Sequence, residues 1–109
     1  MKQLKCPKCD VKMDVFYQLG VEIDQCNSCG GVWLDRDEWK ALTRSRGENA
    51  VELVVVNLTP TDFKCPRCQA DLQEGSHQDH PDFKIDHCTK CGGGFFDRGE
   101  MVRLLARDS

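Results

Sequence analysis

The stretch CNSCGGVWLD at residues 26–35 decides the fold, and it recurs as CTKCGGGFFD at residues 88–97. In each copy a Cys-x2-Cys pair is followed by two glycines, a short apolar run with an aromatic residue, and an aspartate. A second Cys-x2-Cys pair, with proline after its first cysteine, precedes each copy at residues 6–9 and 65–68. A similarity of this length indicates a duplicated unit, so the chain consists of two related halves.

The cysteine spacing predicts a metal site in each half. Two Cys-x2-Cys pairs lie 16 residues apart in the first half and 19 apart in the second, which fits the spacing of zinc sites. Each turn aims two sulfurs at one point, so two turns complete a tetrahedron. Iron–sulfur clusters and disulfides also use such thiols and stay as alternatives. We expect two structural zinc ions per chain, held by Cys6, Cys9, Cys26 and Cys29 and by Cys65, Cys68, Cys88 and Cys91.

Size and composition favour the same interpretation. A half of about 40 residues rarely holds a fold by its apolar core alone, so a metal would stabilise each unit. The chain starts without the charged and apolar regions of a secretory signal, and its longest apolar run, Leu53–Val56, is far too short to cross a membrane. We therefore expect a cytoplasmic protein without a membrane partner. The formal net charge of -3 argues against general coating of nucleic acid.

Between and after the cysteine pairs, hydrophobic alternation predicts short strands. Residues 11–23 alternate around a glycine turn and predict a hairpin, whereas the second half has a clear return strand only at 83–87 and a shorter or looser hairpin. Residues 32–34 and 95–96 predict a third strand in each half. Asp35 with Glu38, and Asp97 with Glu100, have the spacing of a capping box, so helices are expected at about 36–44 and 98–107.

These expectations combine into a small metal-stabilised α+β fold. It has two tandem zinc ribbons, each a short antiparallel β-sheet followed by a C-terminal helix. The expected division is ribbon 1 with its helix at residues 1–46, a linker with an apolar, β-prone segment at 47–62, and ribbon 2 with its helix at 63–109. The segment 51–56 is too apolar for a flexible linker. It predicts either a strand that covers part of the same chain or an edge strand that pairs with another copy or a partner.

The motif CPxC followed by CxxCGGxWLDxxE resembles the bacterial zinc-ribbon family named for the zinc finger of general transcription factor IIB, here in two tandem copies. The first copy matches the motif in full, from Cys6-Pro7-Lys8-Cys9 to Glu38. The second keeps the ligands but has Gly94 in place of Val32 and Phe95-Phe96 in place of Trp33-Leu34. The resemblance implies zinc binding, a three-stranded ribbon and a link to transcription machinery.

The sites also bear on catalysis. A catalytic zinc needs an open coordination position, and four cysteines leave none, so we expect no enzyme activity. Three histidines stand outside the ligand sets, namely His77, His80 and His87. The first two are expected in a solvated loop, and His87 in a strand beside Cys88 rather than as a ligand.

The first functional hypothesis is therefore a non-catalytic adaptor that binds a protein partner. Direct nucleic-acid binding is an alternative, through a basic face of ribbon 1 formed by Lys2, Lys5, Lys8 and Lys12 with Arg36, Lys40, Arg44 and Arg46. A thiol redox switch that releases zinc is a further alternative. A homo-oligomer through residues 51–56 is also considered.

Overall fold

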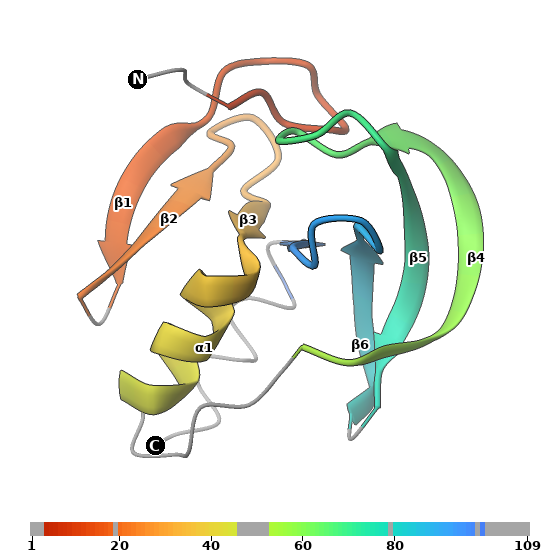
Figure 1. Cartoon of the computed structure of the whole chain (residues 1–109). Coiled ribbons are helices and arrows are strands. Elements are labelled where there is room, and N and C mark those ends of the chain that lie inside the picture. Colours follow the sequence, from red (N-terminus) through yellow and green to blue (C-terminus); the bar gives the residue numbers. More distant parts are fainter. Residues whose placement is uncertain (1–3, 19, 46–52, 79, 98, 100–109) are drawn as a thin grey trace.

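The computed structural model describes residues 4–18, 20–45, 53–78, 80–97 and 99. Within them, seven strands and one helix follow each other along the chain, and antiparallel strands take up far more of the described backbone than the helix does (Figure 1). The elements are β1 (Asp14–Gln18), β2 (Val21–Gln25), β3 (Val32–Leu34), α1 (Arg36–Ser45), β4 (Val55–Lys64), β5 (Asp71–His77), β6 (His80–His87) and β7 (Gly94–Phe96).

All seven strands belong to one antiparallel sheet, in the order β1-β2-β3-β7-β6-β5-β4. The three-strand ribbons β1-β2-β3 and β7-β6-β5 are related by the sequence repeat, and they join where β3 pairs with β7. The expectation of a separate sheet in each ribbon is therefore wrong. The reason is that β3 and β7 are short apolar strands, and each completes its backbone hydrogen bonds on the other.

The second hairpin is longer than the first, which corrects the expectation of a shorter or looser one. β5 and β6 have seven and eight residues, whereas β1 and β2 have five each. The outgoing strand β5 is polar in sequence, but it lies between β4 and β6 and pairs on both sides. Leu72 and Gly75 are buried there, and a Cβ on Gly75 would come within 2.6 Å of Val55 Cγ1. Pairing with β4, the preceding strand along the chain, thus overrides the weak strand pattern of β5.

The two faces of the sheet carry two apolar clusters. On one face, α1 places Trp39 over Leu34 and Phe96, with Ile23 and Ile85 around them. The other face holds the cysteine knuckles, and its cluster centres on Trp33 and Phe95, which are both fully buried. The centre of the sheet is therefore covered on both sides, which explains why every residue of β3 and β7 is buried.

Helix α1 confirms the helix expected at 36–44, and its N-terminus has the predicted cap: the Asp35 N–H donates to Glu38 Oε1 at 2.8 Å. It is the only helix longer than a single residue in the described part of the chain. The helix expected at about 98–107 falls outside the described residues, apart from Gly99, and stays a prediction. No helix of the described residues has the length and apolar character that a membrane crossing requires.

The apolar segment between the ribbons leads into an edge strand. Leu53 is buried in the helix-side cluster, and Val55 and Val56 open β4, which pairs with β5 of the same chain. Among the described residues this matches the expected strand within one chain, while residues 51 and 52 lie outside the description. β4 also runs across the expected boundary at 62/63. The division of the chain into two units with a linker stays a prediction.

Candidate metal centres and the interface between them

Four knuckles of one design carry the eight cysteines. In each, the first cysteine donates its N–H to the carbonyl five residues later, and the residue four positions later donates back to the cysteine carbonyl. Closing this turn requires a left-handed backbone at the fourth position. That position has φ of 59° at Asp10, 77° at Gly30, 66° at Gln69 and 85° at Gly92. Glycine adopts this conformation without strain, which accounts for the first glycine of each CGG motif.

The knuckles bring the predicted ligands together into two groups of four. In each group, Cys6/Cys9/Cys26/Cys29 and Cys65/Cys68/Cys88/Cys91, all Sγ atoms lie within 4.8 Å of one another. The Sγ–Sγ distances are 3.8 Å for Cys6–Cys29, 3.6 Å for Cys65–Cys91 and 3.5 Å for Cys68–Cys88. A tetrahedral zinc with bonds of about 2.3 Å separates its sulfurs by about 3.8 Å. The donor sets therefore fit zinc in both ribbons.

Backbone amides support the sulfurs. The N–H of Cys9 donates to Cys6 Sγ at 3.4 Å, and in the second ribbon the N–H groups of Arg67 and Cys68 donate to Cys65 Sγ at 3.4 and 3.5 Å. Gly31 and Cys91 contribute the same kind of bond to Cys29 and Cys88, each at 3.4 Å. Such donors stabilise negative sulfur and hold the thiolates in place around a metal.

Burial makes the thiolate forms of Cys6 and Cys65 unfavourable unless a cation lies beside them. Desolvation raises the pKa of Cys6 to about 12, against the opposing effect of the amides of Cys9 and Lys8, and it raises the pKa of Cys65 in the same direction. Without a cation these sulfurs would stay protonated at neutral pH. A zinc dication supplies the charge that makes the buried thiolates favourable.

The two ribbons interlock through equivalent residues of β3 and β7. Trp33 and Phe95 occupy the same position in the repeat, and they are directly opposite in the β3–β7 register. The ring of each lies against the second glycine of the other ribbon's CGG motif. A Cβ on Gly31 would come within 2.2 Å of Phe95 Cζ, and one on Gly93 within 2.5 Å of Trp33 Cζ2. The second glycine is therefore required by the packing of one ribbon on the other.

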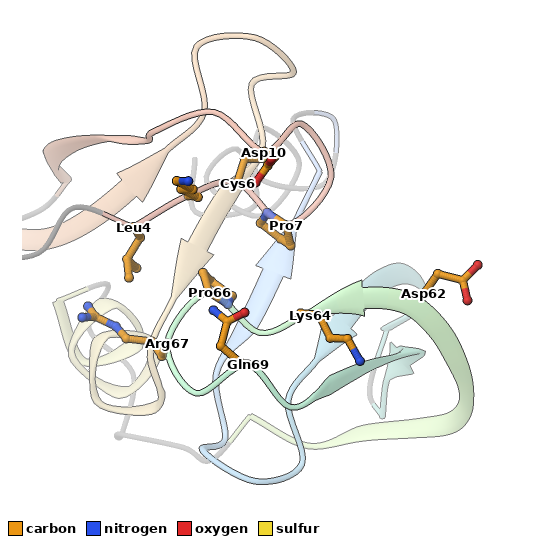
Figure 2. Close-up of a pocket in the computed structure, with 10 residues that line it drawn as sticks. Leu4, Cys6, Pro7, Asp10, Asp62, Lys64, Pro66, Arg67 and Gln69 are labelled. Carbon is orange, nitrogen blue, oxygen red and sulfur yellow. The ribbon is translucent and has the colours of Figure 1, made fainter.

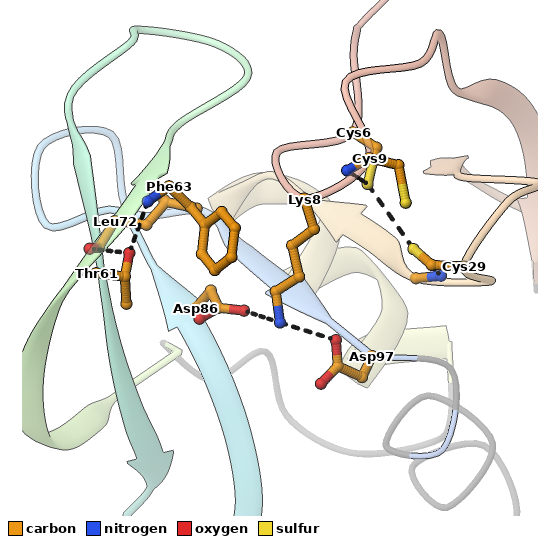
Figure 3. A network of polar contacts seen from close by, with 10 residues as sticks. Cys6, Lys8, Cys9, Cys29, Thr61, Phe63, Leu72, Asp86 and Asp97 are labelled. Atoms are coloured by element: carbon orange, nitrogen blue, oxygen red, sulfur yellow. Dashed lines mark hydrogen bonds and ion pairs between the residues drawn. The ribbon is translucent and has the colours of Figure 1, made fainter.

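A reciprocal pair of ion contacts crosses the same interface. In ribbon 1, the knuckle residue Lys8 reaches ribbon 2, where its Nζ lies 2.9 Å from Asp86 Oδ2 and 3.2 Å from Asp97 Oδ1 (Figure 3). It also lies over the ring of Phe63, 5.5 Å from the centroid. Partial burial acts to lower the pKa of Lys8, but the two carboxylates outweigh it and raise the pKa. Lys8 therefore links the two ribbons through salt bridges.

Arg67 occupies the equivalent place in ribbon 2 and makes the converse contacts. Its Nη2 lies 2.8 Å from Asp35 Oδ2 and its Nε donates to Asp35 Oδ1 at 3.1 Å, with Asp24 Oδ2 at 3.9 Å. Asp24 and Asp35 are the repeat equivalents of Asp86 and Asp97. Each ribbon thus offers one cation and receives the other's with two carboxylates. Trp33 Nε1 also donates to Asp35 Oδ1 at 2.8 Å, so Asp35 links the interface to the cap of α1.

Sequence reasoning missed this interface, and it placed Lys8 on a basic face for nucleic acid. The signal was in the repeat itself, because both Lys8 and Arg67 follow the knuckle proline, and the aspartates recur at equivalent positions. His77 and His87 belong to neither group of thiols, and the expectation of a solvated loop is wrong for His77, because this residue is buried in β5. His87 Nδ1 is 3.0 Å from the Gly93 carbonyl and burial lowers its pKa, while His77 is buried beside the Trp39 ring. The side chain of His80 lies outside the description.

Two four-cysteine groups, each held by a pair of knuckles on a three-stranded part of one antiparallel sheet, define the chain as a tandem zinc-ribbon protein with two structural zinc sites. Residues 5–45 and 64–107 match the transcription factor zinc-finger family, the zinc ribbon of the TFIIB type, and the chain belongs to that family. This confirms the resemblance drawn from the CPxC and CGGxWLD motifs. Comparison with curated proteins and with solved structures gave no match.

Proposed function

We propose that this protein is a non-catalytic adaptor whose zinc ribbons shape a surface for a protein partner. The observation that carries the proposal is a groove of about 640 Å³ between the first knuckles of the two ribbons (Figure 2). Pro7 and Pro66 line it from opposite ribbons, so the groove exists only because the ribbons interlock. A site formed in this way depends on both zinc ions without using either as a reactant.

The metal sites support the non-catalytic part of the proposal. Each of the two groups that could hold a metal has four cysteine sulfurs, which closes a tetrahedral zinc and leaves no position for water or substrate. Within the described residues, no other group of histidine, cysteine or acidic side chains has the arrangement of a metal site. The zinc ions are therefore assigned to structure.

The lining of the groove favours a protein segment as its occupant. Leu4 and the two prolines contribute apolar surface to the lining, and charged residues of both signs line it as well, namely Lys5, Lys64, Arg67, Asp10 and Asp62. A lining that combines apolar groups with both signs of charge is typical of protein interfaces, whereas a phosphate chain would select cations alone. The family's description as a transcription factor zinc-finger suggests that the partner belongs to transcription machinery.

The test is affinity capture with a groove variant and a matched control. Lys5→Glu/Asp62→Lys reverses one charge of each sign in the lining, and Lys90→Glu/Glu22→Lys makes the same exchange at exposed residues outside it. We expect a partner recovered with the wild type and the control and lost with the groove variant, all at two zinc ions per chain. Recovery of no protein, or equal recovery with both variants, would count against the proposed role.

A second candidate, nucleic-acid binding, has one observation in its favour. Lys5 and Lys12 lie directly opposite each other in a β-bridge, where like charges repel unless an anion approaches. The equivalent position in ribbon 2 holds the ion pair Lys64–Asp71. Lys8 does not support this second function, because its side chain forms a salt bridge at the ribbon interface. Gel shifts with single- and double-stranded DNA and RNA decide it: binding that weakens with salt and with Lys5→Glu/Lys12→Glu supports it.

A further inference from the structure

The seven-stranded sheet ends in two edges that differ in their ability to accept another strand. At one edge, β4 contains Pro60, which has no N–H to donate, and Asn57, whose φ of 59° interrupts the extended backbone. Its register with β5 shifts between Val56 and Thr59 and again between Pro60 and Lys64. Natural sheets use such irregularities to prevent pairing at an edge. The β4 edge is therefore unsuited to a further strand.

Strand β1 forms the opposite edge of the sheet (Figure 1). Its register is regular and its exposed side chains are largely apolar. All five of its residues pair with β2 in unbroken register, and the strand contains no proline, glycine or lysine. Three consecutive side chains are exposed: Val15 by 48%, Phe16 by 39% and Tyr17 by 72%. Large apolar side chains along an edge strand mark a pairing site, because sheets that stay unpaired place charge there instead.

The apolar side chains of β1 lie on both faces of the sheet. Phe16 is opposite Ile23, whose side chain belongs to the cluster under α1. Val15 and Tyr17 are opposite Asp24 and Glu22, on the face that carries the knuckles. A strand added beyond β1 would therefore bury apolar area on both faces while completing backbone hydrogen bonds.

We infer that β1 pairs with β1 of a second copy of the chain, in an antiparallel arrangement centred on Phe16. In this register Val15 is opposite Tyr17, and Asp14 is opposite Gln18. Asp14 is the only charged residue of the strand, so no like charges meet. The molecule already contains this arrangement, because β3 and β7 pair antiparallel about the equivalent residues Trp33 and Phe95. The inference goes beyond the proposed adaptor role, since it uses the sheet edge and leaves the groove free.

The assembly stops at two chains. A two-fold pairing of β1 with itself uses both β1 edges, and the edges that remain in the described sheet are the two irregular β4 strands. The result is one continuous sheet across a symmetric dimer, with a knuckle groove in each copy. A closed dimer rather than a fibre follows from the contrast between the two edges.

Sedimentation equilibrium on the zinc-loaded full chain tests the inference. The wild type is expected at twice the chain mass of 12.4 kDa. Phe16→Lys places two ammonium groups opposite each other at the two-fold axis, and we expect it to raise the dimer dissociation constant at least about tenfold. Val56→Lys is the matched control, since Val56 is exposed by 38% on the β4 edge and Phe16 by 39% on β1. The control should remain dimeric.

Native mass spectrometry with two zinc ions per chain shows that each variant is folded. If Phe16→Lys does not fold, Tyr17→Lys replaces it, because that side chain is already 72% exposed. A wild type that stays monomeric up to about 0.1 mM, where weak interfaces are populated, overturns the inference. A dimer that survives the β1 substitution, or that Val56→Lys disrupts equally, does so too. The groove variant Lys5→Glu/Asp62→Lys should still dimerise, so failure of the adaptor role and failure of the dimer are read separately.

Discussion

The two ribbons share their knuckles and differ in their central strands, and the difference is complementary. Ribbon 1 has Val32 and Leu34 where ribbon 2 has Gly94 and Phe96. In the β3–β7 register Leu34 is opposite Gly94, and Val32 is opposite Phe96, so the smallest residue of one strand meets a larger one of the other. Two copies of either strand would lack this fit. The duplicated units have therefore become a specific pair, and each serves as the other's packing partner.

Helix α1 extends the dependence of ribbon 2 on ribbon 1. Trp39 of α1 stacks on Phe96 of ribbon 2, with ring centroids 5.5 Å apart and planes 3° apart. Leu53, from the segment between the ribbons, fills the space beside Gly94, 3.1 Å from where a Cβ would lie. The core of ribbon 2 thus includes side chains that ribbon 1 and the connecting segment supply.

Removing one zinc ligand should have the largest effect on the stability of the two ribbons. Cys26→Ser and Cys88→Ser each abolish one site, and structural zinc contributes roughly 10–16 kcal/mol of apparent binding free energy in small modules. Each variant is expected to unfold its own ribbon and to lower the thermal midpoint of the other, because Trp33 and Phe95 then lose their opposing partner. Zinc counting by native mass spectrometry and calorimetry measure both effects.

The two variants Cys26→Ser and Cys88→Ser serve as each other's control, since both ligands are buried and occupy equivalent positions in the repeat. We expect both variants to destabilise the other ribbon, because unfolding of either ribbon removes the Trp39–Phe96 stack. A surviving ribbon with unchanged stability in either variant would show that the two units are independent.

Local patterns in the sequence predicted the parts of the fold that local chemistry determines. The knuckles, β3, β7 and the cap of α1 each depend on residues within a few positions, such as Asp35 and Glu38. The joining of β3 to β7 depends on contacts between distant segments, and the burial of β5 depends on its pairing with β4; periodicity reports neither. The salt bridges of Lys8 and Arg67 left a signal in the sequence, because a cation and two aspartates recur at equivalent positions of both repeats. That recurrence does not reveal which ribbon each cation contacts.

Truncating the central aromatic pair should have the next largest effect on stability. Trp33→Ala and Phe95→Ala remove fully buried rings and should each cost about 3–5 kcal/mol of unfolding free energy. The two rings are directly opposite, so the double variant should cost less than the sum of the single ones. Denaturant unfolding at saturating zinc measures the coupling. Strict additivity would mean that the rings stabilise their own ribbons separately.

The salt bridges of Lys8 and Arg67 should differ in strength, although the two residues occupy equivalent positions in the repeat. Lys8 is 26% exposed and Asp86 6%, so Lys8→Met leaves a buried carboxylate without its partner and should cost about 1–3 kcal/mol. Arg67 is 43% exposed and lies 3.9 Å from buried Asp24, so Arg67→Met should cost only about 0.2–1 kcal/mol. Equilibrium unfolding of both variants at low and high salt gives the comparison. A larger loss for Arg67→Met would mean that its two contacts to Asp35 outweigh burial.

The smallest expected effect is a pH dependence from Glu38 at the cap of α1. Burial raises the pKa of Glu38 to about 7, with the Asp35 amide acting in the opposite direction. The ordinary value is 4.5, so the folded state holds this proton more tightly than the unfolded state. The stabilisation is complete below pH 4.5 and is lost as pH rises through about 7. Glu38→Gln keeps an acceptor for the Asp35 N–H and removes the titration.

Wild type and Glu38→Gln should therefore have denaturation midpoints that diverge between pH 4.5 and 7, the wild type falling relative to the variant. Protonation of the zinc thiolates destabilises both proteins at low pH, so the difference between them isolates the carboxyl group. Parallel midpoints across this range would mean that folding leaves the pKa of Glu38 unchanged, because the positive charge of Arg67 and the Asp35 amide offset the effect of burial.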